Sequence, residues 1–124
     1  MTPLLQVALG GALGATARYL TGNAMARLLG KDFPWGTLTV NFLGSFLMGV
    51  VVVVLAHENG NKFAPLLMTG MLGGFTTYSA FSLDAMTIFE RGEYGLASVY
   101  VIGTLILALG GIALGLYSAR SFYA

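Results

Sequence analysis

The stretch GGFTTYSAFS, Gly73 to Ser82, interrupts a chain that is otherwise strongly apolar. Each of its two adjacent glycines destabilises a helix by roughly 1 kcal/mol relative to alanine. Five hydroxyl-bearing side chains follow them, and hydroxyls that bond the local backbone make unwinding easier. We therefore expect a helix that is broken within this stretch.

The composition of the whole chain indicates an integral membrane protein. Of 124 residues, 56% are hydrophobic and only 9% are charged, whereas a soluble domain carries about 25% charged residues. The net charge of +1 provides no basic field for nucleic acid. With no cysteine and one histidine, thiolate sites and histidine-based metal or catalytic sites are excluded. We expect no enzyme, because the central stretch has no carboxylate, imidazole or thiol.

Four apolar segments are long enough to cross a bilayer, which takes about 20 residues. The basic n-region of a cleavable signal is missing from MTPLLQVALG at the N-terminus, so we interpret it as part of the first span. The polar sequences GKDFP, HENGNK and ERGEYG separate the segments. The expected fold is an all-α membrane protein, a single domain over residues 1–124, with helices over residues 3–29, 35–56, 64–89 and 96–117.

The orientation of these spans is poorly specified by charge. Four spans place both termini on one side. Near the two loops on the opposite side lie Arg27, Lys31 and Arg91, while Lys62 and Arg120 lie on the side of the termini. Since orientation follows an asymmetry in Lys and Arg, three against two leaves two alternatives: a weakly biased single topology, or insertion both ways round.

Small residues at four-residue spacing indicate close helix packing in lipid. Such a bundle of four helices is thin, so we expect the chain to assemble with itself. The small-residue pairs are Gly10/Gly14, Gly11/Ala15, Ser45/Gly49 and Gly111/Gly115.

Several polar side chains fall inside the expected spans, where an unsatisfied polar group costs several kcal/mol. Asn41 and Thr104 are either interhelical hydrogen-bonding residues or part of a polar path, and Tyr100 lies one turn before Thr104. An intramembrane arginine such as Arg18 faces protein or a water-filled cavity. Asp84 lies near the end of its span, which suits a vestibule.

A helix broken inside the membrane exposes carbonyls of one half and N–H groups of the other. These groups suit a small cation and an anion respectively, and such breaks persist where they line a cavity. Tyr78 and Phe81, three residues apart, project on one face. They are either ordinary packing aromatics or rings whose positive edges face an anion.

These motifs, taken together over essentially the whole length, resemble the Fluc/CrcB family of fluoride channels. The first is G-G-x-x-G-x-x-x-R, from Gly10 to Arg18. The second is G-T-L-x-V-N, from Gly36 to Asn41. The third is the central stretch itself, Gly73 to Ser82.

The resemblance implies a passive channel that exports cytoplasmic fluoride across the plasma or inner membrane, as a multi-pass protein. It also implies an antiparallel, dual-topology homodimer with two pores and a structural Na⁺ at its centre, bound by the carbonyls of Gly73 and Thr76. The implied fluoride pathway comprises Asn41, Tyr78, Phe81, Ser79, Tyr100 and Thr104, with Arg18 and Asp84 as polar support in the vestibule.

Two positions depart from the family pattern. Tyr78 stands where a phenylalanine is expected, and Ala108 stands where a hydroxyl is expected. Two other functions remain open. A small multidrug-type, proton-coupled transporter has the same size and span number, but it needs a carboxylate in the first span, which here holds only Arg18. A non-transporting membrane assembly subunit would use the polar residues for packing alone.

Overall fold

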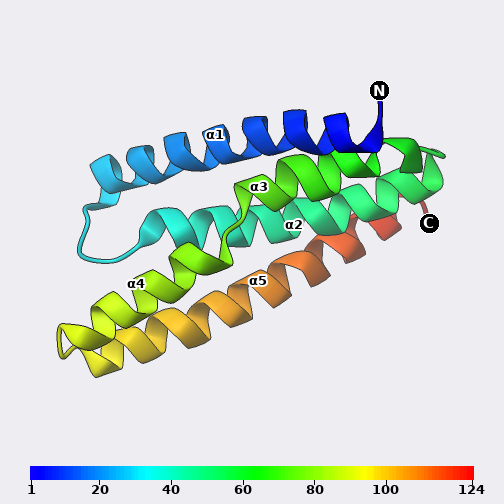
Figure 1. Ribbon diagram of the computed structural model, residues 1–124. Helices are drawn as coiled ribbons and strands as arrows, with labels where there is room; N and C mark the ends of the chain where they lie inside the picture. The colour runs from blue at the N-terminus through cyan, green and yellow to red at the C-terminus, as the bar shows by residue number, and fades with distance from the viewer.

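The fold is a bundle of long helices, seen in a computed structural model that describes all residues 1–124 (Figure 1). α1 lies along η2 and α3, α2 packs along α5, and α4 lies against α5. Both termini lie at the same end of the bundle. The elements are α1 (Pro3–Leu29), α2 (Trp35–His57), the 3-10 turn η1 (Asn61–Phe63), the π-helix η2 (Pro65–Leu72), α3 (Gly73–Phe75), α4 (Tyr78–Glu90) and α5 (Tyr94–Phe122).

The surface of the bundle is apolar, as the composition predicts. Two helices, α2 and α5, are long and apolar enough to cross a membrane. Only 17 of 124 residues are buried, and large apolar side chains are exposed along every long helix. Water would not tolerate such a surface, so the single chain must be covered by lipid, by another protein surface or by both.

The C-terminal helix is longer than expected. α5 begins at Tyr94 rather than at residue 96, and ends at Phe122 rather than at residue 117. Hydropathy marks only the apolar part of a helix, whereas the hydrogen bonds of α5 continue through its polar last turns. Beyond it, the Tyr123 ring stacks on His57 with centroids 4.1 Å apart, and the Tyr123 hydroxyl donates to Glu58 at 2.8 Å. These contacts attach the C-terminus to the end of α2.

Small residues bring the backbones of neighbouring helices together within one chain. A Cβ added at Gly10 would lie 2.9 Å from the Met71 nitrogen on η2, and one at Gly49 would lie 2.8 Å from the Leu116 nitrogen on α5. Gly115 in turn lies against the Phe46 carbonyl of α2. These positions are therefore used for packing inside the chain, so they do not by themselves support self-assembly.

The chain leaves helical geometry at two threonines rather than at the paired glycines. Gly73 remains helical, with φ −63° and ψ −37°. Thr76 (φ −84°, ψ 160°) and Thr77 (φ −151°, ψ 123°) are extended, and α4 begins after them. Gly74 is needed for helix packing and not for unwinding, because a Cβ at this position would lie 2.9 Å from the Gly11 carbonyl oxygen. The glycine lets α1 approach this segment closely.

Candidate functional site

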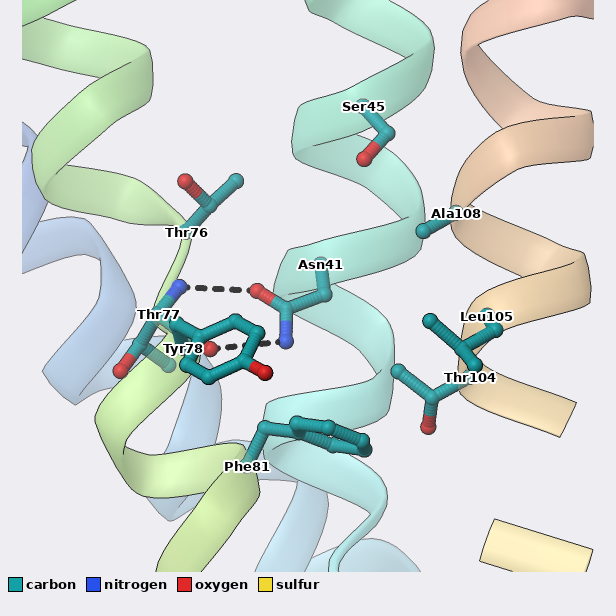
Figure 2. A pocket seen from close by; sticks show the side chains of 9 residues that line it. All are labelled: Asn41, Ser45, Thr76, Thr77, Tyr78, Phe81, Thr104, Leu105 and Ala108. Atoms are coloured by element: carbon teal, nitrogen blue, oxygen red, sulfur yellow. Dashed lines mark hydrogen bonds between the residues drawn. The ribbon is translucent and has the colours of Figure 1, made fainter. Parts of the chain in front are cut away.

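The extended residues between α3 and α4 are held by a side chain from α2. The Asn41 carbonyl oxygen accepts a hydrogen bond from the Thr77 N–H at 2.8 Å, and its amide nitrogen donates to the Thr77 carbonyl at 3.0 Å. Figure 2 shows both bonds. One side chain thus satisfies both backbone groups of Thr77, and the second N–H of the amide is left for another acceptor.

Hydroxyl groups form hydrogen bonds to the backbone on either side of the extended residues. The Thr77 hydroxyl accepts from the Ala80 N–H at 3.2 Å and caps the start of α4. The Thr76 hydroxyl donates to the Leu72 carbonyl at 3.0 Å. The hydroxyl cluster that marked this stretch in the sequence therefore provides local hydrogen bonds to the backbone.

An arginine from α1 binds the end of α3. The Arg18 Nε donates to the Gly74 carbonyl at 3.1 Å, which satisfies one of the last carbonyls of the first helical half. Arg18 also lines a second pocket, of about 230 Å³, that lies between α1, α2 and α4 and includes Thr77. Hydrogen bonds from Arg18 of α1 and from Asn41 of α2 therefore hold the residues between α3 and α4 from two sides.

Two carbonyls at the break lose the partners that a continuous helix would supply. The Thr77 N–H, which would reach the Gly73 carbonyl one turn earlier, donates to Asn41. The Ala80 N–H, which would reach the Thr76 carbonyl, donates to the Thr77 hydroxyl. Gly73 is moreover exposed. The oxygens of Gly73 and Thr76 are the type of ligand that hard cations bind, so the donor set fits a small cation such as Na⁺.

A pocket of about 230 Å³ opens beside Asn41, between α2, the start of α4 and α5. Tyr78 and Phe81 form one wall, with ring centroids 5.9 Å apart and planes at 65°. Figure 2 shows these rings facing the side chains of α2 and α5. The lining residues are Asn41, Ser45, Thr76, Thr77, Tyr78, Phe81, Thr104, Leu105 and Ala108.

Thr104 is 5% exposed, and its hydroxyl oxygen is buried with no hydrogen-bond partner. In an apolar region such a group is costly, so a ligand in the pocket would stabilise it. The pocket combines this hydroxyl, the free N–H of Asn41 and aromatic ring edges. It carries no charged side chain, and it suits a small anion that is bound weakly.

Tyr100 and Asp84 lie together, nearer the loops that follow α1 and α4. The Asp84 carboxylate accepts from the Thr37 hydroxyl at 2.7 Å and from the Tyr100 hydroxyl at 3.2 Å. Tyr100 is 1% exposed and does not line the pocket beside Asn41. Asp84 does line two other pockets, of about 270 and 70 Å³, that also contain Lys31.

The structure brings together some of the residues singled out in the sequence and separates others. Asn41, Tyr78, Phe81, Thr76 and Thr104 line one pocket. Ser79 is exposed on α4 and lines none of the pockets described. Sequence reasoning placed Ser45 in a packing pair, Thr77 among the hydroxyls of the central stretch and Thr37 in a motif, but it gave none of them a place in the site. A local signal existed only for Ser45, which follows Asn41 by one helical turn.

The fold and the site define an apolar helical protein with a small pocket, free of charged side chains, beside the extended residues between α3 and α4. Residues 5–116 match the model of the CrcB family, described as CrcB-like protein, Camphor Resistance. The chain belongs to this family, which sets aside the small multidrug-type alternative.

Relatives with a functional name are similar over their full length. The fluoride-specific ion channel FluC of Cereibacter sphaeroides is 61% identical over 124 residues, covering 100% of this chain and 99% of the relative. Proteins with the same name from Paracoccus denitrificans (52% identical, covering 97% and 96%) and Ruegeria sp. strain TM1040 (53%, covering 94% and 94%) are also similar.

We predict that Asn41→Ala loosens the break. Losing two hydrogen bonds of about 0.5–1.5 kcal/mol each should raise amide hydrogen exchange at Thr77 about 5- to 150-fold. Hydrogen exchange with mass spectrometry measures this change. Asn23→Ala, which removes an exposed amide from α1, is the matched control. Equal protection of Thr77 in both variants would contradict the bracing role of Asn41.

Proposed function

We propose that the protein is a fluoride-selective passive channel. The observation that carries the proposal is the pocket beside Asn41, which offers a neutral amide, a free buried hydroxyl and two aromatic rings directly at a helix break. Ring edges and neutral donors attract an anion without the tight binding of a lysine, and conduction requires release as well as binding. The names of the relatives support fluoride as the ion.

Fluoride reaches this site from the cytoplasm and leaves outward. When the medium outside the cell is acidic, part of the fluoride is neutral HF, which crosses the bilayer and ionises in the neutral cytoplasm. The anion is then trapped, and the membrane potential drives it out through any passive path. A channel in the plasma or inner membrane therefore reduces fluoride toxicity without coupling to an energy source.

Four membrane crossings underlie this function. α1, α2 and α5 each cross once, and η2, α3 and α4 cross together, with the break at Thr76 and Thr77 near mid-membrane. α1 has 27 residues, which span about 40 Å at 1.5 Å per residue. The position of both termini at one end of the bundle supports an even number of crossings.

The channel is an antiparallel homodimer with two pores. Tyr78 lines the pocket yet is 80% exposed, so one chain leaves the pocket open on that side. A second copy in inverted orientation closes it, and by symmetry the dimer then has two such pockets. The near balance of Lys and Arg between the two ends supports insertion in both orientations.

A structural Na⁺ lies at the centre of this dimer, bound by the carbonyls of Gly73 and Thr76 from each chain. Hydrogen bonds at Asn41 and Thr77 remove the helical partners of both carbonyls. Gly73 is exposed, as Tyr78 is, so a two-fold axis at this surface can bring two copies of the oxygens together.

Fluoride efflux from liposomes tests the proposed function. Vesicles that contain the protein and potassium fluoride should release fluoride, measured with a fluoride electrode, when valinomycin balances the charge. Phe81→Leu should lower the rate about 2- to 12-fold, since an aromatic edge contact is worth about 0.5–1.5 kcal/mol. Phe89→Leu, on the exposed part of α4, should conduct like the unmodified chain. Absence of efflux from the unmodified protein would refute the channel.

The dimer is tested by copurification and labelling. A tagged and an untagged copy should purify together, and a cysteine-free chain with one cysteine added at a terminus should label from both sides of the membrane in comparable amounts. Labelling from a single side would exclude dual topology while leaving fluoride conduction possible.

The Na⁺ site is tested by ion replacement. Exchanging Na⁺ for N-methylglucamine should lower the thermal stability of the assembled dimer. Gly73→Val should do the same, although a Cβ at Gly73 meets no atom of its own chain closer than 3.4 Å. If the melting temperature of the dimer is the same with and without Na⁺, the proposed Na⁺ site is wrong.

A further inference from the structure

Ser45 occupies a position in the pocket that the proposed function has not used. It lies on α2 one turn after Asn41, about 6 Å closer to the end of the bundle that holds the termini. Figure 2 places its side chain above Asn41, on the side of α2 that borders the pocket. Across the pocket at that level, α5 provides Ala108, whose methyl group offers no hydrogen bond.

The hydroxyl of Ser45 forms no hydrogen bond within the chain, unlike six other hydroxyls on these helices. Those six donate to the carbonyl one turn earlier; they belong to Thr16, Thr21, Thr76, Ser82, Thr87 and Ser98. Ser45 forms no such bond, and neither does Thr104, whose hydroxyl oxygen is buried in the wall of this pocket. The Tyr78 hydroxyl, also in the pocket lining, is a third free donor. Free donors gathered at one small pocket between apolar helices indicate that a ligand satisfies them.

The Ser45 and Thr104 hydroxyls lie at different levels of the pocket. In Figure 2 the Thr104 oxygen lies near the Phe81 ring, whereas Ser45 lies beyond Asn41 in the opposite direction. An anion that moves from Phe81 past Asn41 therefore meets the Ser45 hydroxyl next. Without Ser45, the ion would face the Ala108 methyl on one wall and no donor on the other.

We propose that Ser45 forms a second fluoride-binding position, reached after the ion passes Asn41 and the ring pair. The position rests on the proposed channel function. The Ser45 hydroxyl donates its hydrogen to the anion, and because serine is neutral the ion is released again. Ser45 thus provides from α2 the donor that α5 lacks at Ala108.

Ser45→Ala in reconstituted protein tests this position. Loss of one hydrogen bond of about 0.5–1.5 kcal/mol should lower fluoride efflux about 2- to 12-fold, with the elution volume of the assembled protein unchanged. Ser98→Ala is the matched control, because it removes an exposed α5 hydroxyl that donates to the Tyr94 carbonyl. If Ser45→Ala conducts as Ser98→Ala does, the position is refuted. If the unmodified protein does not conduct, the proposed function fails first.

Ala108→Ser separates ion contact from packing. In the Ser45→Ala background it should restore efflux to within about twofold of the unmodified rate, because it returns a donor to the same level of the pocket from the facing wall. Alone, it should lower the fluoride concentration at which efflux saturates, since two donors then bind the ion. This second measurement does not depend on how Ser45→Ala folds. Failure of the rescue, or unchanged saturation, would overturn the proposal.

Discussion

The two hydrogen bonds between Asn41 and Thr77 are the interaction on which the site depends. Extended backbone between two apolar helices leaves polar groups unpaired, at a cost of several kcal/mol for each in hydrocarbon. The Asn41 amide satisfies both groups of Thr77 at once. A hydrophobic side chain at position 41 could not do so, and the lowest-energy alternative would be to continue the helix. A continuous helix would remove both the pocket wall and the freed carbonyls.

The positive charge of Arg18, which supports the break between α3 and α4, lies outside the pocket beside Asn41. Arg18 binds the Gly74 carbonyl, yet it lines the pocket between α1, α2 and α4 and not the one beside Asn41. A guanidinium beside the rings would bind an anion strongly and slow its release. Because α1 supplies the cation and α2 supplies the neutral amide, the segment is fixed from two sides while the pocket remains uncharged.

Local sequence signals predicted the helices and the region of the break, but not its partners. Hydropathy and the GKDFP, HENGNK and ERGEYG turns are local, and they place the long helices to within a few residues. The paired glycines suggested unwinding at Gly73, whereas the chain unwinds at Thr76 and Thr77 because Asn41, far away in sequence, offers a backbone partner only there. Tyr100 was expected to line the fluoride pathway together with Thr104, and in the structure its hydroxyl donates a hydrogen bond to Asp84. Spacing along one helix cannot reveal which neighbouring helix a side chain will reach.

The Asp84 cluster shows how an acidic residue can support the pocket beside Asn41 without lining it. Its carboxylate accepts from Thr37 and Tyr100, which join α2, α4 and α5. The Tyr100 ring lies 5.3 Å from the Phe81 ring on one side and 5.4 Å from Phe33 on the other. Phe81 therefore rests against a ring that the carboxylate holds in place. Two hydrogen bonds disperse the charge of this carboxylate. Since Asp84 does not line the pocket beside Asn41, its effect there is to position the Phe81 edge through Tyr100.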